Sequence, residues 1–272
     1  MPIFEGTLTR TTYEQRGAGP DIVWISGGGD PGESWHTYQL PHFESSFRNT
    51  TFDNRGISPA TCSQPLPWTI ADMARDAAEL IEAVCDPPVI VVGHSMGAMI
   101  VEQLAVDFPE LVRVGIAMGA AARSHGWVYD YMKAEIDYRI GGGSLDGMLA
   151  VSHYAASLYP ALVLGDDTLW PTIRDGLSSW LATDANEASL IGQWDACQTF
   201  DVTEQLPACT VPLHVFTFLE DVQAPPQYGR EIVALCPTAE LHEFAGMGHG
   251  SIHGHTHHEL NARIEEIARG YL

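Results

Sequence analysis

Residues Val89–Ala105 read VIVVGHSMGAMIVEQLA, and this stretch decides the fold. It opens with a continuous run of aliphatic residues, 89–92, of the kind found in strands that are covered on both faces. From Met99 onward the apolar residues recur three and four positions apart, as they do on an amphipathic helix. Residues 93–97 must therefore turn a strand into a helix within a tight bend, which only small residues can flank.

The residues of this bend, Gly93-His94-Ser95-Met96-Gly97, match the pattern G-x-S-x-G of a nucleophile elbow. In such an elbow Ser95 occupies a strained apex, so its hydroxyl projects from the sheet. The following helix begins beneath the serine, and the backbone amide of Met96 can then donate a hydrogen bond to an oxyanion. The pattern alone can arise by chance, but its place between a strand and a helix indicates a nucleophilic serine.

A serine hydroxyl needs a base to remove its proton, and the base is usually a histidine held by a carboxylate. For this kind of elbow the expected chain order is serine, acid, histidine. The predicted acid is Asp221, in a proline-closed loop after the strand-like LHVFTF, with Glu220 as the alternative. The predicted base is His249, in the loop AGMGHG that follows ELHEF. Ser95, Asp221 and His249 are therefore the predicted catalytic residues.

The composition is that of a globular protein with one domain and an insertion. The chain has 272 residues, of which 45% are hydrophobic and 18% charged, so there is ample material for a core. Its formal charge of -22 repels phosphate backbones and anionic lipids, so neither nucleic acid nor a membrane is an expected partner. The charge is otherwise explained by a soluble acidic surface.

The cysteines and the first residues of the sequence give an expectation of the cellular location. The five cysteines are scattered and never form a C-x-x-C pair, which argues against a disulfide framework and a zinc site. The start, MPIFEGTLTRTTYEQ, lacks the features of a secretory signal, and no apolar run is long enough to span a membrane. We expect a cytoplasmic protein.

Strand-like and helix-like segments alternate over most of the chain, which favours a largely parallel sheet with helices on both faces. Strands are expected at 7–15, 21–25, 47–52, 89–92, 112–118, 212–218 and 240–244, and helices at 69–84, after Ser95, and at 259–270. The region 122–207 breaks this rhythm because it contains helix-like segments and no convincing strand. We predict that it is a helical cap, and that residues 1–121 and 208–272 form the core domain.

These motifs resemble those of α/β-hydrolase fold proteins, and the similarity runs from about Asp21 to the end. With the elbow, three further motifs stand in the family's order: D-x-R-G at Asp53, D-x-x-x-P at Asp221 and G-x-G-H ending at His249. The stretch 193–212 also resembles the family's return from cap to sheet. It implies the α/β-hydrolase fold, with a mostly parallel sheet and an inserted helical cap.

The resemblance also points to an oxyanion hole and a pocket. Ser26-Gly27 stands where the family usually has His-Gly, so the amide of Gly28 would be the second oxyanion donor beside that of Met96. Because the missing histidine normally holds this loop, its replacement puts the shape of the loop in question. The aromatic residues expected to line the substrate pocket are Trp35, Trp127, Tyr154 and Trp194, although Trp35 would equally suit a packing role.

Two other features have simpler explanations than ligand binding. The glycine-rich loop SGGGDPGES has no following lysine and does not match a phosphate-binding pattern. Histidines 253, 255, 257 and 258 do not have the spacing of a metal site, and we expect them on the solvent-facing start of a helix. No metal and no organic cofactor is implied.

The resulting hypothesis is hydrolysis of a carboxylic ester or lactone of a small molecule through an acyl-enzyme. The cap region has few cations, so a neutral, apolar substrate is expected. The alternatives are a C–C bond hydrolase of the meta-cleavage product type, a cofactor-free perhydrolase, and, in a different class, a non-catalytic ligand receptor on the same fold. A homo-oligomer is compatible with the sequence, which does not determine the oligomeric state.

Overall fold

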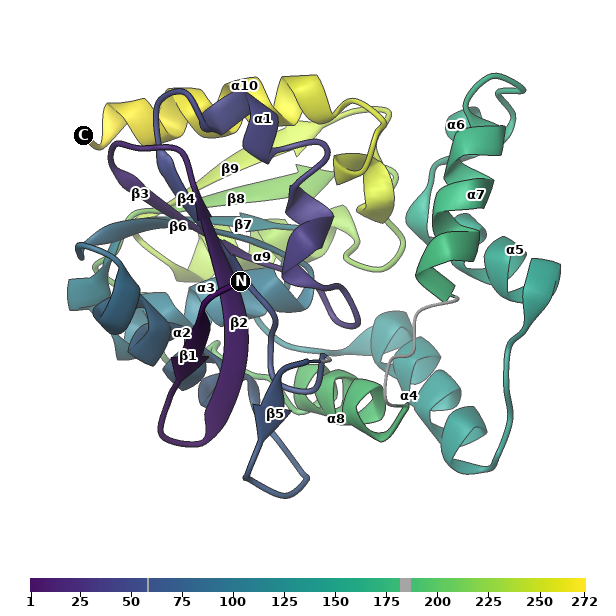
Figure 1. The fold of residues 1–272 in the computed structure, drawn as a ribbon. Helices are drawn as coiled ribbons and strands as arrows, with labels where there is room; N and C mark the ends of the chain where they lie inside the picture. The colour runs from purple at the N-terminus through teal and green to yellow at the C-terminus, as the bar shows by residue number, and fades with distance from the viewer. Residues whose placement is uncertain (58, 182–186) are drawn as a thin grey trace.

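The computed structural model describes residues 1–57, 59–181 and 187–272, and in this part of the chain nine strands form one sheet (Figure 1). The strand order is β1-β2-β4-β3-β6-β7-β8-β9, and β5 pairs with β2. Neighbouring strands from β4 to β9 are parallel, whereas β1, β2 and β5 pair antiparallel. The strands are β1 (Ile3–Glu5), β2 (Thr9–Arg16), β3 (Asp21–Ile25), β4 (Arg48–Phe52), β5 (Thr61–Cys62), β6 (Val89–His94), β7 (Val112–Met118), β8 (Leu213–Phe218) and β9 (Ala239–Phe244).

Helices cover both faces of this sheet, which confirms the predicted fold class. Figure 1 shows α1 (Leu40–Phe43) and α10 (His257–Gly270) on one face, with α2 (Ile70–Val84) and α3 (Met96–Asp107) on the other. Helix α9 (Pro226–Leu235) packs into the same apolar cluster as α2 and α3. Strand β6 is buried along its whole length, which explains its continuous aliphatic run.

The sequence predicts the central elements and misses several peripheral ones. Helix α2 has its predicted start, because Thr69 and Asp72 form a reciprocal capping box at its N-terminus. The sequence does not predict β1, β5 or α9. Helix α9 contains Gly229, a residue that lowers helix propensity, but a Cβ atom there would lie 2.0 Å from the hydroxyl oxygen of Thr217. Packing of α9 against the sheet therefore requires Gly229, and the same glycine is the reason why the sequence does not predict this helix.

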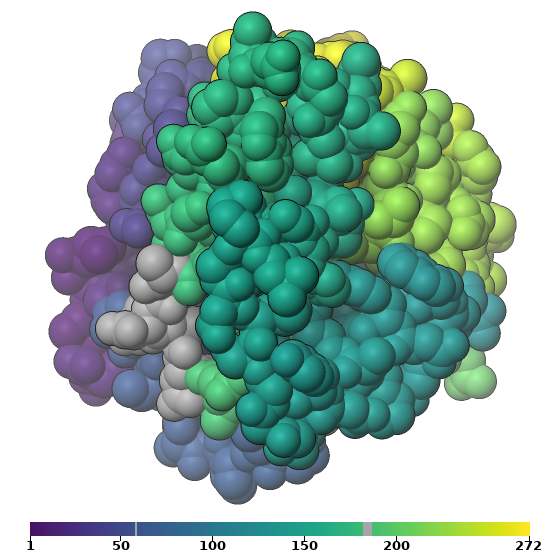
Figure 2. Space-filling model, turned by 90° about the vertical axis from the view of Figure 1, so that its right-hand side faces the viewer, coloured from purple at the N-terminus to yellow at the C-terminus, as the bar shows by residue number. Residues whose placement is uncertain are grey.

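Between β7 and β8 the chain forms five helices in its described part, in the region where a cap is predicted, and we call these five helices the cap. Residues 182–186 of the predicted span lie outside the described residues. Figure 2 shows the cap, in teal and green, lying over the middle of one face of the molecule. The cap helices are α4 (Gly126–Ile140), α5 (Gly147–Leu158), α6 (Ala161–Leu164), α7 (Trp170–Leu181) and α8 (Glu187–Gln198).

None of the helices in the described ranges combines the length and the apolar composition needed to cross a membrane.

Candidate active site

Ser95 lies at the sharp turn between β6 and α3, as the sequence predicts. Its backbone angles are φ 56° and ψ -120°, a strained combination for a residue with a side chain. A Cβ atom at Gly93 would lie 2.2 Å from the carbonyl oxygen of Gly97, and one at Gly97 would lie 2.1 Å from that of Ile25. Both flanking glycines are therefore required by the close approach of the backbone.

Asp221 and His249 are brought together by the loops after β8 and β9. Nδ1 of His249 lies 2.7 Å from Oδ2 of Asp221 and donates to this carboxylate. The other oxygen, Oδ1, accepts from the backbone amides of Gln223 and Ala224, each at 2.8 Å. The carboxylate is thus fixed from two sides and buried. The alternative acid, Glu220, is exposed.

With its Nδ1 proton directed at Asp221, His249 keeps a lone pair on Nε2. This atom is buried and makes no hydrogen bond within the described residues, and His249 lines the same cavity as Ser95. Gly119, at φ 60°, packs against the ring, and a Cβ atom there would lie 3.1 Å from Cε1 of His249. The end of β7 therefore leaves room for the imidazole that the sequence assigns as the base.

His94, inside the elbow, supports His249 from behind and is not predicted as a site residue. Its Nε2–H donates to the carbonyl oxygen of His249 at 2.9 Å, and the two rings lie 4.7 Å apart. Burial, with smaller contributions from the neighbouring histidines 249 and 253, holds the pKa of His94 well below its usual value. His94 is therefore a neutral residue that supports the loop of His249, the predicted base.

The loop after β3 runs beside Ser95, and hydrogen bonds hold it although the family's usual histidine is absent. The hydroxyl of Ser26 donates to the carbonyl of Pro31 at 3.1 Å, and the amide of Asn54 donates to the carbonyl of Ser26 at 3.1 Å. A Cβ atom at Gly27 would lie 3.4 Å from Cβ of Ser95. Gly28, the predicted second oxyanion donor, lines the cavity with Met96.

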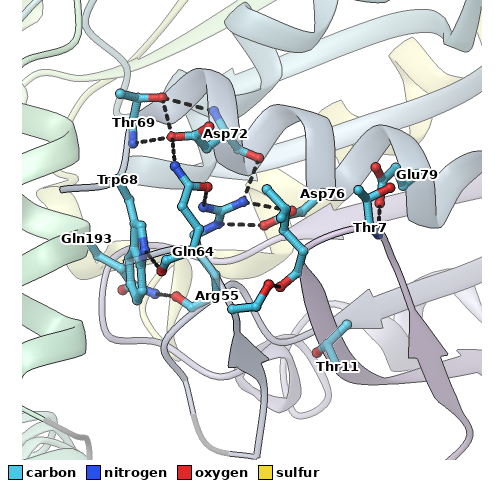
Figure 3. A network of polar contacts seen from close by, with 12 residues as sticks. Thr7, Thr11, Arg55, Gln64, Trp68, Thr69, Asp72, Asp76, Glu79 and Gln193 are labelled. Atoms are coloured by element: carbon cyan, nitrogen blue, oxygen red, sulfur yellow. Dashed lines mark hydrogen bonds and ion pairs between the residues drawn. The ribbon is translucent and has the colours of Figure 1, made fainter. Parts of the chain in front are cut away.

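Gln193 on α8 connects the cap to this loop, a role that the sequence does not predict. Its Oε1 accepts from the amide of Gly29 at 2.9 Å, and its Nε2 donates to the carbonyl of Arg55 at 2.7 Å. The side chain is fully buried, so both bonds are shielded from water. One cap residue thereby contacts two loops of the core, and Figure 3 shows its contact with Arg55.

Arg55 has a structural role in this arrangement. Its guanidinium donates to both oxygens of Asp76 on α2, at 2.7 and 2.8 Å, and to Gln64 at 2.8 Å (Figure 3). Asp53 accepts from the amide of Gly32 at 2.8 Å. The D-x-R-G segment therefore positions the loops around the elbow without contributing to the cavity lining.

Core and cap together enclose a cavity of about 850 Å³ with Ser95 in its wall. Two of the predicted aromatic residues, Tyr154 and Trp194, line it. The indole of Trp194 lies 3.2 Å from the position that a Cβ atom of Gly28 would take, and the Arg139 guanidinium lies 5.2 Å from the centre of the indole ring. A side chain at position 28 would therefore require Trp194 to move by a few tenths of an ångström, whereas any residue there would provide the amide.

The other two aromatic predictions are wrong for the pocket. Trp35 is buried in the core, where its ring lies 5.1 Å from that of Trp24, and it does not reach the cavity. Trp127 lies on the outer side of α4, where it is 56% exposed and stacks on Tyr131. In both cases the packing around the side chain decides its direction.

The cavity also contains polar groups that the sequence analysis does not assign. His253 and His255, expected on a solvent-facing helix start, instead line the cavity before α10 begins at His257. Asp30, in the glycine-rich loop, lines it as well. Burial raises the pKa of Asp30, against the opposing influence of His253 and His249.

Away from the cavity, His214, Glu240 and His242 bring three potential metal-ligand atoms within 4.8 Å of one another in the described chain. Hydrogen bonds account for this cluster. Arg263 donates to Nδ1 of His242, whose Nε2 lies 2.9 Å from Nδ1 of His214, and Nε2 of His214 lies 3.2 Å from the hydroxyl of Tyr271. Since Arg263 requires a lone pair on Nδ1, the Nε2 of neutral His242 carries a proton and is not available to a metal.

The chain is similar to known proteins over most of its length. A Mycobacterium tuberculosis protein named as a non-heme bromoperoxidase, BpoC, is 30% identical over 255 residues, covering 89% of this chain and 91% of the relative. Its solved structure superposes with a TM-score of 0.90 over 96% of both chains. A Variovorax paradoxus protein named as a carbamate hydrolase, RutD, is 25% identical, covering 93% of this chain and 91% of the relative.

More distant structures share the fold. The enol-lactonase of Burkholderia xenovorans superposes with a TM-score of 0.80 at 19% identity, over 98% of both chains. The sequence model of the alpha/beta hydrolase family matches residues 22–263. With the elbow, the strand order and this match in agreement, the chain belongs to the alpha/beta hydrolase family, a family of enzymes.

Proposed function

We propose that the protein hydrolyses a carboxylic ester or lactone of a small, largely apolar molecule, with Ser95 as the nucleophile. The observation that supports this most strongly is the pairing of His249 with Asp221. It leaves Nε2 of His249 without a hydrogen-bond partner among the described residues, and His249 and Ser95 line the same cavity. A neutral imidazole in this tautomer is ready to accept the serine proton.

The mechanism follows from these positions. Nε2 of His249 takes the proton of Ser95 as the hydroxyl oxygen attacks the substrate carbonyl carbon. The backbone amides of Met96 and Gly28 stabilise the oxyanion, and His249 then protonates the departing alcohol oxygen. A water molecule, deprotonated by the same imidazole, attacks the acyl-enzyme and releases the acid and the free serine. Asp221 holds the imidazolium that forms in each half-reaction.

The test is hydrolysis of p-nitrophenyl esters of increasing chain length, together with aromatic and aliphatic lactones. The wild type is compared with Ser95→Ala and His249→Ala. We expect each substitution to lower kcat by about 10⁴-fold or more, because the triad acts as a unit. A wild-type protein that is inert on the whole panel, or variants that retain full turnover, would contradict the proposal.

A second candidate is perhydrolysis at the same site, and the similarity to the protein named as a bromoperoxidase favours it. In this reaction hydrogen peroxide, in place of water, attacks the carbonyl carbon of the acyl-enzyme. The acyl group is released as a peracid, and the proton lost by the peroxide returns to the oxygen of Ser95. Hydrolysis assays repeated with added peroxide distinguish the two outcomes. Peracid formed in preference to carboxylic acid would identify a perhydrolase.

C–C bond hydrolysis of anionic dienoates is less well supported. Arg123 is the only Lys or Arg among the described lining residues, and it lies 2.9 Å from Glu231. An anionic substrate would therefore find little charge compensation in this cavity.

A further inference from the structure

The charges around the cavity favour a cationic ligand. Three carboxyl groups, those of Asp30, Glu33 and Glu135, belong to its described lining. Glu135 is compensated by Arg139 at 3.2 Å, and Glu33 is exposed to solvent. Asp30 is the carboxyl group that remains inside the cavity without compensation by a Lys or Arg in the described lining.

Asp30 lies close to the reacting centre. Its Oδ2 atom is 3.2 Å from the position that a Cβ atom of Gly27 would take, and that same position is 3.4 Å from Cβ of Ser95. Both residues belong to the wall of one cavity. A small substrate bonded to Ser95 can therefore reach Asp30 with another part of its structure.

The neighbours of Asp30 are those of a cation site. The indole of Trp180 on α7 donates a hydrogen bond to the carboxylate, and Tyr159 lies near enough for the negative charge of Asp30 to affect its pKa. Tyr38, Tyr159 and Trp180 all line the cavity. Aromatic faces attract ammonium groups, and a nearby carboxylate supplies the opposite charge.

The imidazole of His253 does not supply the positive charge that would compensate Asp30. Burial lowers the pKa of His253, so this ring is neutral at neutral pH even though it lies near Asp30. The carboxylate is thus left with the hydrogen bond from Trp180 and with aromatic rings nearby, but without a Lys or Arg among the described lining residues. Binding of a cation would supply that charge.

We propose that Asp30, with the rings of Tyr159 and Trp180, binds an ammonium group of the substrate. On this inference, which rests on the proposed ester or lactone hydrolysis, the substrate has an apolar body, a scissile acyl group and a protonated or quaternary amine. The neutral substrate expected from the sequence is replaced by a cationic one. A carboxylate at Asp30 selects for the positive charge.

The experiment uses pairs of esters that differ only in charge. Butyrylcholine is compared with neohexyl butyrate, in which carbon replaces nitrogen in the alcohol part. The p-nitrophenyl ester of γ-butyrobetaine is compared with its carbon isostere, which places the charge in the acyl part. We expect the wild type to prefer the cationic member of at least one pair by about 10-fold or more in kcat/KM.

In Asp30→Asn this preference should fall to about one, since the amide keeps the size of the side chain and removes its charge. Glu33→Gln is the matched control, because it removes one carboxylate at the exposed rim, and it should keep the wild-type preference. Equal kcat/KM values for both members of both pairs in the wild type would overturn the inference while leaving ester hydrolysis established.

A binding measurement separates this inference from the proposed reaction. Titration of tetramethylammonium into Ser95→Ala, which does not require turnover, should show saturable binding that weakens about 10-fold or more when Asp30→Asn is added. Binding that is unaffected by Asp30→Asn would overturn the inference even if the esters are hydrolysed. If no ester is hydrolysed but this binding is observed, the cation subsite stands and the proposed reaction fails.

Discussion

The two walls of the cavity are built in different ways. On the core wall, Ser95, Asp221 and His249 follow the carboxyl ends of strands, and backbone geometry fixes them: the turn at Ser95 and the two amides that bind Asp221. On the cap wall, Tyr154 and Trp194 are placed by side chains, because Arg139 donates to the Tyr154 hydroxyl at 2.8 Å and lies over the Trp194 ring. Backbone geometry therefore holds the predicted catalytic residues of the core wall, whereas contacts between side chains place the aromatic residues of the cap wall.

Of the substitutions that test this difference between the walls, Asp221→Asn on the core wall should cause the largest loss of kcat. An asparagine amide can donate to Nδ1 of His249, which favours the wrong tautomer and leaves Nε2 protonated. We expect kcat to fall by about 10⁴-fold at neutral pH. Steady-state hydrolysis of the best p-nitrophenyl ester measures this loss.

The neighbouring Glu220 provides a control of the same charge. Glu220→Gln should change kcat by less than about 2-fold, because its exposed side chain is not part of the predicted triad. If Glu220→Gln were the inactive variant and Asp221→Asn the active one, the assignment of the acid would be reversed.

The next effect concerns the residue that joins the two walls. Gln193→Glu keeps the acceptor for Gly29 but loses the donor to Arg55, so the loop that carries Gly28 is less firmly held. If Gly28 supplies an oxyanion donor, kcat should fall by about 10²-fold while KM changes much less. A trifluoromethyl ketone that mimics the tetrahedral intermediate should bind more weakly to this variant by a similar factor.

Gln198, near the end of the same helix, offers a matched control. Its amide donates to the carbonyl of Tyr129 at an exposed position, so Gln198→Glu loses one cap contact without reaching the oxyanion loop. Turnover should be close to that of the wild type. An equal loss of kcat in both variants would show that Gln193 only stabilises the cap.

The same contrast explains what the sequence could predict. The residues of the core wall can be predicted because their sequence signals are local. Val89–Ala105 contains a strand, a turn of small residues and a helix, and its glycines lie where the backbone leaves no room for a Cβ atom. Strands β3 and β7 have the predicted bounds. The chain order of serine, acid and histidine then indicated which distant residues to combine.

The residues of the cap wall can be predicted from the sequence only in part, because the direction of an aromatic side chain depends on neighbours that are remote in the sequence. Trp127 and Tyr154 look alike as aromatic residues in helical segments, yet one is exposed and the other lines the cavity. Asp30 and His253 come from opposite ends of the chain and carry no shared motif. The sequence indicates Gln193 only as part of the return from cap to sheet, since a single glutamine gives no pattern.

The smallest expected effect concerns stability, on the helix that supports the core wall. Glu102 on α3 is fully buried, and neither carboxyl oxygen has a hydrogen-bond partner in the described part of the chain. Burial raises its pKa well above the usual range. The folded protein therefore holds this carboxyl protonated at pH values where the unfolded chain has already released the proton.

The sign of the pH dependence follows from linkage. Because the folded state binds more protons than the unfolded state, this group lowers the free energy of unfolding as pH rises above about 4.3, by at most about 1.4 kcal/mol per pH unit, until the folded pKa is passed. Glu102→Gln removes the ionisation, so its stability relative to the wild type should increase as the pH rises above about 5, until the folded-state pKa of Glu102 is passed. Urea unfolding at several pH values measures this difference.

Turnover provides the second part of this test, because Glu102 does not line the cavity. Glu102→Gln should keep kcat within about 2-fold of the wild type, whereas its relative stability increases with pH. Glu110→Gln removes an exposed carboxylate beyond the end of the same helix and should show little pH-dependent change in relative stability. A stability difference between Glu102→Gln and the wild type that does not vary with pH would mean that Glu102 is ionised in the folded protein. A buried, ionised Glu102 would require a cationic partner close to α3. The stability of the core wall would then depend on side-chain charge, as the arrangement of the cap wall does.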